Sequence, residues 1–545
     1  MLNSYRYPSS HRPTAMGVNG MVSSAHPLAS LAGIQVLSMG GNAFDAAVAT
    51  AATLNVVEPY MSGVGGIGLA LAYVANEDRV RTLNFSGRMP KAATPDRFTD
   101  ESVRQGILAP LIPGNLAGWF TLHETYGSLE WERLFQPAIG YAANGFPITF
   151  VNSSIIQETA HNLREFPKSS ETILRSDGNA PKPGERLVWP DLARTLDLIA
   201  HQGPDVFYQG EIAEKIVKQS QAMDGLFTMD DLAEYEVEWQ EPISANYRGY
   251  DIFVPPPNSS GFQVLQTLKM MEMIQPRYQD PDTLHYFMES VKLAVTDRIV
   301  YAGDPDYVTA PIAGMLSGQY AAEQYERVDM ERAAVVRGEH YAENTPDNFL
   351  RPGDPTKFDL GMTTHFAIAD RDGNVVSVTQ TLGGGFGSSV IAGDTGIFLN
   401  NMSSYFDLDE GSPNLIGPWK RVDFVVAPTQ SFVDGKFILS MGTPGGWGIL
   451  QTTPQFLMNV LDYGMNVQQA IEAPRLRYFT GRHVKMEERF PLQVREELVR
   501  RGHEIDVLNA FSRTVGGAQG IQVDQEQGTF QGGADPRRDG VALGY

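Results

Sequence analysis

The feature that most restricts the fold of this chain is a pair of strand-like segments joined by a short polar turn. Residues 363–369 and 375–381 are rich in apolar and β-branched side chains, and residues 370–374 between them contain an Asp-Gly pair. An Asp-Gly turn between two such segments predicts a β-hairpin. The chain therefore contains a rigid antiparallel hairpin whose first strand begins at a Thr-Thr pair.

A long polar segment runs directly into this hairpin. Residues 336–362 contain three prolines and many polar residues, with no helical or strand period. Such a composition is typical of an exposed connection. We expect an exposed linker at about 336–362 that ends where the first hairpin strand begins.

Helical and strand patterns are mixed along the rest of the chain. The Ala-rich segment 42–57 predicts a buried helix with Asn42 as its N-cap. The 545 residues of the whole chain suffice for two to four domains or one large unit. The patterns predict α/β or α+β, with further helices at 191–202, 211–222, 261–274 and 283–301 and short strands at 250–254 and 366–369.

The composition excludes several classes of protein. The chain has 42 basic and 64 acidic residues, a formal charge of −22, which argues against a nucleic-acid partner. It has no cysteine, so disulfides, thiol nucleophiles and thiolate metal sites are excluded. The N-terminal residues show no apolar signal segment, and no apolar run reaches the ~18 residues of a membrane span. We expect a cytoplasmic protein without a membrane partner.

Common catalytic motifs are absent from the sequence. There is no GxSxG or HExxH motif, and the ten histidines lack metal-ligand spacing. We therefore expect no metal and no cofactor. The glycine-rich segment 383–387 is followed by no Lys-Ser/Thr pair, which favours a backbone turn over a phosphate-binding loop.

The junction between linker and hairpin is the one place where a chemical idea fits the local pattern. A cut before Thr363 would give this residue both a nucleophilic hydroxyl and a basic α-amine. Such an amine has a pKa of about 7.7–8.0, so an appreciable fraction is neutral near pH 7. The pattern alone leaves the ordinary alternative open, because threonine is common in strands.

The residues around this junction resemble the start of the small subunit of the γ-glutamyltranspeptidases. The resemblance extends from about His26 to Tyr545. In the second half of the chain it rests on residues 363–366, 370–374, 378–382, 386–387, 392–397, 399–401, 443–446 and 534–537. In the first half it rests on residues 40–43, 45–47, 65–66, 113–114, 118, 136–138, 145–146, 247–250, 255–261, 297–298 and 303–305.

This resemblance implies an N-terminal-nucleophile hydrolase. The implied fold class is α+β, a four-layer αββα sandwich formed jointly by both halves of a self-cleaved proenzyme. The implied cut between Met362 and Thr363 gives a large chain, 1–362, and a small chain, 363–545, that remain one intertwined unit. Thr363 would be the nucleophile, the Thr381 hydroxyl would hold it, and the amides of Gly445 and Gly446 would stabilise the oxyanion.

The pocket that recognises a glutamyl group in this family is not retained. The family's arginine falls on Ser86, its Ser-Ser pair on Phe424 and Val425, its acidic and amide pair on Met402 and Tyr405, and its asparagine on Gly383. These changes would leave a bound zwitterion without partners, which is costly. We expect an acyl group without the α-ammonium, as in the similar oxamate amidohydrolases and cephalosporin or glutaryl acylases. The short segment 406–420 implies a reduced lid, which favours hydrolysis over transfer.

Three functions remain open from the sequence. The first is a self-processing amidohydrolase that acts on a small-molecule amide with a non-glutamyl acyl group. The second is a γ-glutamyl hydrolase or transpeptidase that acts on glutathione through a pocket rebuilt from Arg88, Tyr405, Arg421 and Asp423, although Arg88 is equally consistent with a surface ion pair. The third is a non-catalytic relative that never matures, which the retained nucleophile and glycine pair disfavour. The sequence gives no oligomeric state.

Overall fold

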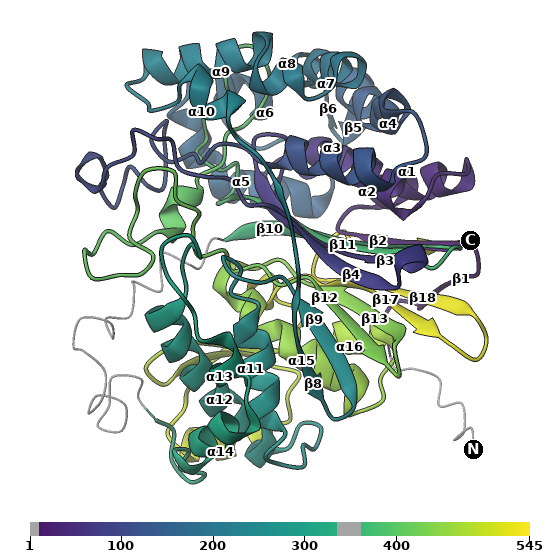
Figure 1. The fold of residues 1–545 in the computed structure, drawn as a ribbon, viewed down its shortest axis with the longest axis vertical. Coiled ribbons are helices and arrows are strands. Elements are labelled where there is room, and N and C mark those ends of the chain that lie inside the picture. The colour runs from purple at the N-terminus through teal and green to yellow at the C-terminus, as the bar shows by residue number, and fades with distance from the viewer. Residues whose placement is uncertain (1–9, 335–360) are drawn as a thin grey trace.

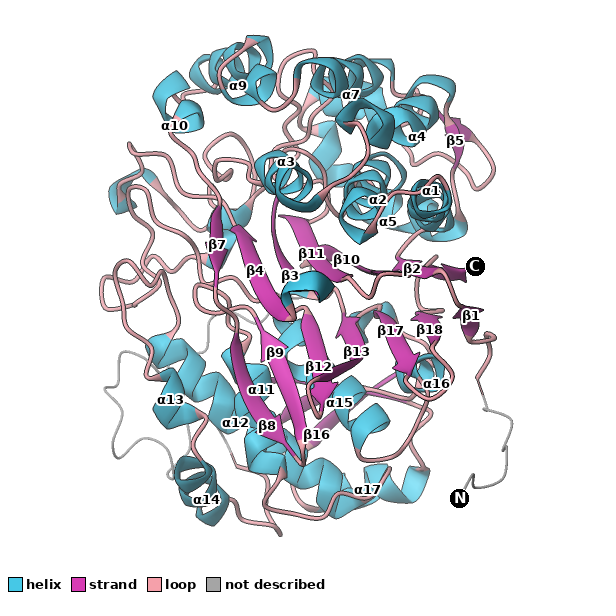
Figure 2. Ribbon diagram, turned by 45° about the vertical axis from the view of Figure 1, so that its right-hand side comes forward, coloured by secondary structure: helices cyan, strands magenta, loops and turns pink. Residues whose placement is uncertain are grey.

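Two large antiparallel sheets form the middle of the molecule. The computed structural model describes residues 10–334 and 361–545. Each large sheet has seven strands, and the two lie against each other with helices on both outer sides (Figure 1). The turned view shows the same order of layers, helix, sheet, sheet, helix (Figure 2). The predicted mixed α+β class is confirmed.

The first sheet contains the predicted hairpin at its centre. Its strand order is β19-β2-β10-β11-β3-β4-β7. The strands are β19 (Val541–Gly544), β2 (Gly20–Ser24), β10 (Met362–Asp370), β11 (Val375–Gly383), β3 (Ile67–Val74), β4 (Arg79–Phe85) and β7 (Glu238–Gln240). Strands from before and after residue 362 therefore pair with each other within one sheet.

The second sheet is also drawn from both ends of the chain. Its order is β1-β18-β17-β13-β12-β9-β8. The strands are β1 (Ala15–Gly17), β18 (Thr529–Ala534), β17 (Gln519–Asp524), β13 (Lys436–Gly442), β12 (Thr429–Val433), β9 (Tyr250–Val254) and β8 (Ile243–Tyr247). Smaller sheets are formed by β14 (Leu476–Thr480), β15 (His483–Glu487) and β16 (Glu504–Leu508), and by β5 (Phe146–Pro147) and β6 (Arg186–Leu187).

Helices cover the outer faces of both sheets. Beside the first sheet lie α1 (Pro27–Ser38), α2 (Ala43–Val57), α3 (Asn115–Tyr126), α4 (Trp131–Asn144), α5 (Phe150–Arg164), α6 (Pro167–Ile173), α7 (Pro190–Gln202), α8 (Asp205–Tyr208), α9 (Glu211–Ala222) and α10 (Met229–Ala233). Beside the second lie α11 (Phe262–Met271), α12 (Pro281–Tyr301), α13 (Ile312–Met315), α14 (Gly318–Glu326), α15 (Ile449–Leu461), α16 (Val467–Glu472) and α17 (Leu492–Arg500). Short 3₁₀ turns are η1 (Ala75–Glu77), η2 (Pro95–Arg97), η4 (Met402–Tyr405), η5 (Gly446–Gly448) and η6 (Arg513–Val515).

Helix α2 is the buried helix expected from the sequence. Asn42 caps it, accepting hydrogen bonds from the amides of Phe44 and Asp45, while the Asp45 carboxylate accepts from the Asn42 amide. Every residue of the helix is buried. Its small alanine side chains allow close packing against α1, α4 and the hairpin, and capping satisfies its first amides. The helix therefore fixes one face of the sheet that holds Thr363.

The other predicted elements differ from the structure mainly at their ends. The helix expected at 261–274 ends at Met271, and the helix expected at 283–301 begins at Pro281 because Asp280 caps it. The strand expected at 366–369 lies in the second half of β10, whose residues are buried on both faces because helices cover one side and the second sheet the other. The expected linker at about 336–362 lies outside the described residues except for its last two positions.

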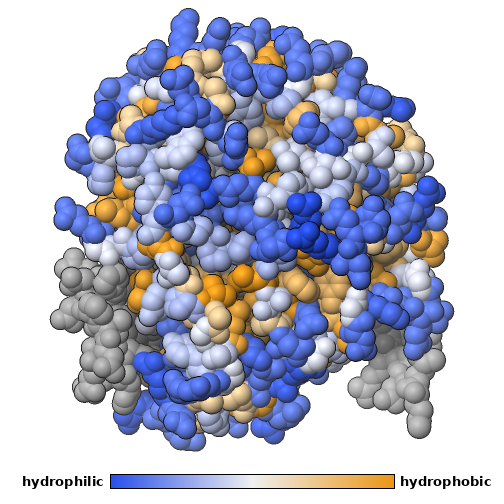
Figure 3. All heavy atoms as spheres, in the orientation of Figure 1, coloured by the Kyte–Doolittle hydropathy of each residue, from blue (hydrophilic) through white to orange (hydrophobic). Residues whose placement is uncertain are grey.

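The face of the molecule in Figure 3 is mostly polar, as expected for a chain with many charged residues. Hydrophobic residues are gathered near the middle of this face. No helix among residues 10–334 and 361–545 is both long and apolar enough to cross a membrane.

Candidate active site

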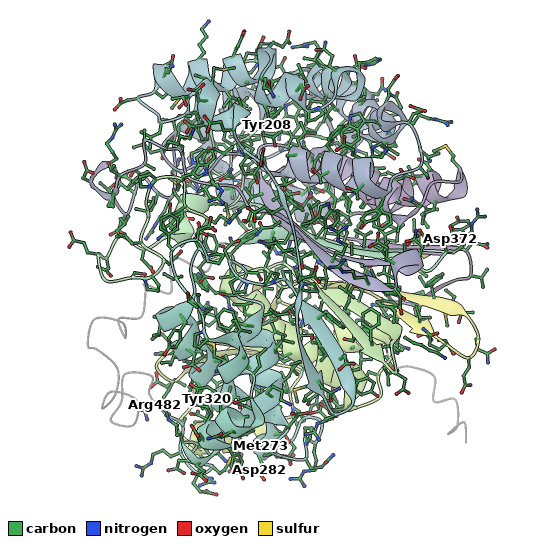
Figure 4. The ribbon with its side chains drawn as sticks, viewed as in Figure 1. Tyr208, Met273, Asp282, Tyr320, Asp372 and Arg482 are labelled. Atoms are coloured by element: carbon green, nitrogen blue, oxygen red, sulfur yellow. The ribbon has the colours of Figure 1, made fainter. Side chains whose placement is uncertain are left out.

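The hairpin places Thr363 directly opposite Thr381. In the register of β10 and β11, Thr363 pairs with Thr381 and Met362 pairs with Gly383, with a bulge between Met362 and Thr363. Asp372, in the turn that joins the two strands, lies at the edge of the molecule (Figure 4). Both threonines, at the other end of the hairpin, are only 2% exposed. The bulge thus sits at the Met362–Thr363 peptide bond, inside the protein.

The Thr381 hydroxyl contacts both the Met362 carbonyl oxygen and the Thr363 hydroxyl. It donates a hydrogen bond to the Met362 carbonyl oxygen at 2.6 Å and accepts one from the Gly383 amide at 2.7 Å. The Thr363 hydroxyl lies 3.4 Å from the Thr381 hydroxyl, at the long end of the hydrogen-bond range. A donor on the Met362 carbonyl draws electron density from its carbon, which makes that carbon more open to attack.

Gly445 and Gly446 form a turn between β13 and η5. Their φ angles are +138° and +54°, conformations that favour glycine. Among residues 10–334 and 361–545, no acceptor is found for either amide. A Cβ added at Gly361 would lie 2.7 Å from the Gly446 Cα atom, 3.1 Å from its nitrogen and 2.6 Å from the Tyr405 hydroxyl. Gly361 therefore packs closely against Gly446 and the Tyr405 hydroxyl.

One surface pocket lies away from these residues. It has a volume of about 620 Å³ and lies beside Phe150, Phe511 and Arg513. Its lining contains none of the predicted site residues.

Glu58 and Arg538 contact the first residues after this peptide bond. The Thr364 hydroxyl donates to Glu58 Oε2 at 2.9 Å, and Arg538 Nη1 donates to the Thr363 carbonyl oxygen at 3.1 Å. Glu58 is 2% exposed, and its burial raises its pKa to about 7, against the smaller opposing effects of Arg538 and Thr364. Neither residue was predicted from the sequence. The one available signal was an acidic residue directly after an apolar helix.

His365 is not placed to act as a base. Its Nδ1 atom lies 2.9 Å from the Thr379 hydroxyl, and its ring packs against Gly442. Burial lowers its pKa to about 3, so the ring is neutral near pH 7. It is a core histidine with one hydrogen bond.

Arg88 and Arg421 lie together in a cluster of ion pairs. The Arg88 guanidinium donates to the Trp419 carbonyl at 2.8 Å and to Asp306 at 3.0 Å. Arg421 pairs with Glu238 and lies 3.3 Å from Asp306. Both arginines also lie within 4 Å of Asp304. Three acidic groups thus surround the two cations.

The other residues at the predicted pocket positions form ion pairs or hydrogen bonds with neighbouring side chains. Asp423 pairs with Arg298 at 2.7 Å and accepts a hydrogen bond from Ser260. Ser86 exchanges hydrogen bonds with Asn258. Of the four residues in the rebuilt-pocket prediction, Tyr405 is the one placed beside Gly361 and Gly446.

One group of side chains in the described structure has the composition of a metal site. Ligand atoms of His285, Glu289 and His503 lie within 4.8 Å of one another, and all three residues are buried. His285 Nδ1 and His503 Nε2 are hydrogen-bonded at 2.8 Å, and the Lys292 ammonium bonds to Glu289 at 2.7 Å. A metal ion would have to lie beside this buried ammonium, so the residues fit a hydrogen-bonded cluster better than a cation site.

Comparison with known proteins decides the family. The family model for gamma-glutamyltranspeptidase matches residues 29–545. The chain belongs to this family. It is 36% identical to the glutathione hydrolase-like YwrD proenzyme of Bacillus subtilis, over 97% of this chain and 99% of that protein. It is also 36% identical to the acylase ACY 1 proenzyme of Pseudomonas sp., over 97% of this chain and 94% of that protein.

A solved structure supports the same conclusion. The crystal structure of cephalosporin acylase from Bacillus halodurans superposes with a TM-score of 0.89 at 34% identity, covering 100% of this chain and 99% of that one. As a member of the gamma-glutamyltranspeptidase family, this protein is a hydrolase that acts on amide bonds. The predicted family membership is confirmed.

Proposed function

We propose that the chain is a self-processing amidohydrolase that cuts itself between Met362 and Thr363 and then uses Thr363 as its nucleophile. The observation that carries this proposal is the Thr381 hydroxyl, which donates to the Met362 carbonyl at 2.6 Å and lies 3.4 Å from the Thr363 hydroxyl. One side chain thus contacts both the bond to be cut and the attacking group.

Cleavage requires an acyl shift followed by hydrolysis. The Thr363 hydroxyl oxygen attacks the Met362 carbonyl carbon, the peptide C–N bond breaks, and its nitrogen takes the hydroxyl proton. Water then hydrolyses the resulting ester, leaving a Met362 carboxylate and a free Thr363 amine. The products are a large chain, 1–362, and a small chain, 363–545. Since each large sheet contains strands from both halves paired with one another, the two chains would remain one structural unit.

The mature enzyme repeats this chemistry on an external amide. Thr363 Oγ attacks the substrate carbonyl while its own α-amine takes the proton and passes it to the leaving amine. In this proposal the amides of Gly445 and Gly446 stabilise the oxyanion once residue 361 has moved away from Gly446. Water resolves the acyl-threonine, and no cofactor is needed for these steps.

The acyl group in this proposal lacks the α-ammonium of glutamate. Met402 and Tyr405 offer no anionic partner for such a cation, and the Ser86 hydroxyl is occupied by Asn258. The charges of Arg88 and Arg421 are matched by neighbouring acids, so neither is a ready partner for a substrate carboxylate. The relatives named as acylases are consistent with a non-glutamyl substrate.

The second candidate is a γ-glutamyl hydrolase that acts on glutathione. It is favoured by the relative named as a glutathione hydrolase-like proenzyme. Initial hydrolysis rates of glutamyl, glutaryl and oxamyl anilides by the purified, matured protein would separate the two. Faster turnover of the glutaryl or oxamyl compound is the expected result. A strong preference for the glutamyl compound would overturn the proposed acyl group while leaving the nucleophile assignment intact.

A further inference from the structure

The start of β10 lacks a neighbouring strand on one side. Strand β10 pairs with β11 from Met362 to Ala369, whereas its pairing with β2 covers only Ala367–Asp370. Residues 363–366 are therefore held by a strand on one side only. The missing strand is important after cleavage, because a chain end that few contacts hold in place frays.

Two side chains from distant parts of the sequence occupy the unpaired region. Arg538 Nη1 donates to the Thr363 carbonyl oxygen at 3.1 Å, supplying a donor where no strand is present. Glu58 accepts from the Thr364 hydroxyl at 2.9 Å. Successive side chains of a strand point to opposite faces, so Glu58 holds the face opposite to the Thr363 hydroxyl. Glu58 therefore cannot act as a base on that hydroxyl, although it can fix the strand that carries it.

The position of Glu58 disfavours a negative charge, so stability does not explain why an acidic residue lies there. It is the C-cap residue of α2, where the helix dipole disfavours a negative charge. It is buried, and within the described residues no basic group lies within 4 Å of its carboxylate to form an ion pair. Local violations of this kind occur where a protein places groups for function.

We propose that Glu58 and Arg538 are positioning residues that hold residues 363 and 364 in register after the chain is cut, so that the free Thr363 end stays opposite Thr381. This inference rests on the proposed function of Thr363. Glu58 acts through the Thr364 hydroxyl and Arg538 through the Thr363 carbonyl. Neither contacts the Thr363 hydroxyl in the structure.

The test uses kinetics of the full-length, matured enzyme with an anilide substrate. Thr364→Val removes the hydroxyl with little change in volume, and Glu58→Gln weakens the acceptor. Each is expected to lower kcat at least tenfold with KM changed less than twofold, because a misplaced nucleophile slows the chemical step. Thr364→Ser should restore most of kcat. The double variant should be no worse than either single one, because both remove the same hydrogen bond.

Asp45→Asn is the matched control. Asp45 is as buried as Glu58 and lies at the other end of the same helix, where it caps α2. This variant should lose thermal stability and keep kcat. A wild-type kcat in matured Thr364→Val, or an equal loss in Asp45→Asn, would overturn the inference. If Glu58→Gln fails to fold, Thr364→Val and Thr364→Ser still decide the question. A wild-type chain that stays uncut would instead contradict the proposed function itself.

Discussion

The Thr381 hydroxyl donates a 2.6 Å hydrogen bond to the carbonyl oxygen of Met362, the residue before the proposed nucleophile. Because Thr363 pairs with Thr381 across the hairpin, this contact follows directly from the strand register. A shift of one residue would turn the Thr381 side chain to the other face of the sheet. The fold thus fixes the geometry at the peptide bond before any chemistry occurs.

Thr363→Ala is expected to abolish both self-cleavage and amidase activity. One hydroxyl serves both reactions in the proposed mechanism, so its loss should lower turnover by at least roughly 1,000-fold. Thr363→Ser, which keeps a hydroxyl, should retain part of each. Gel electrophoresis follows the cleavage, and an anilide assay follows the turnover. Undiminished turnover by the alanine variant would rule out Thr363 as the nucleophile.

Thr381→Val should slow self-cleavage by about 100-fold, the usual cost of about 3 kcal/mol for one lost donor on a developing oxyanion. The measurement is the rate of appearance of the small chain. Thr379→Val is the matched control, since Thr379 lies two residues earlier on the same face of β11 and contacts His365 instead. Equal rates for the two variants would show that the bond to Met362 is not important for cleavage.

Gly361→Ala should slow cleavage without affecting the enzyme once it is cut. The new methyl group would meet the Gly446 backbone and the Tyr405 hydroxyl at under 3 Å, and overpacking of this kind costs about 1–3 kcal/mol. Material that does mature should have the wild-type kcat, because residue 361 then belongs to the end that moves away. Gly314→Ala, where an added Cβ meets nothing within 4 Å, serves as the control. Cleavage at the wild-type rate would contradict the packing described here.

The free energy of unfolding should depend on pH through Glu58. Burial raises the pKa of Glu58 from 4.5 to about 7, so between these values the folded state binds more protons than the unfolded state. Stability from this group is therefore present below about pH 4.5 and is lost as the pH rises to 7, by about 3 kcal/mol. The charged or titratable groups that act on Glu58 are Arg538, Asp539 and Tyr60.

Glu58→Gln removes this dependence. Compared with the parent chain, the variant should gain up to about 3 kcal/mol of stability between pH 5 and pH 8. Denaturant unfolding at pH 5 and at pH 8 measures the free energy of unfolding of the parent chain and of the variant. Both chains also carry Thr363→Ala, so that neither is cut. A difference between the two chains that stays constant with pH would contradict the raised pKa.

Local signals in the sequence predicted the elements that carry the candidate site. The Asp-Gly turn predicted the hairpin of β10 and β11, and alanine content with Asn42 predicted α2. These predictions succeeded because the determining residues are close in sequence. The pairing of Thr363 with Thr381 follows from the turn, which sets the strand register.

Contacts between distant segments could not be predicted in the same way. Glu58 meets Thr364 across 306 residues, and Arg538 meets Thr363 across 175. The acids that surround Arg88 and Arg421 come from two other places in the chain, residue 238 and residues 304–306, so a sequence comparison cannot show that these cations are already paired. The close contact between Gly361 and Gly446 likewise depends on how the two sheets pack.

The most direct test of this account is the mass of the chains in active protein. Mass spectrometry of purified, active material should find a chain that begins at Thr363 with a free amine and a second chain that ends at Met362. Active protein in which the Met362–Thr363 bond is intact would contradict the central claim.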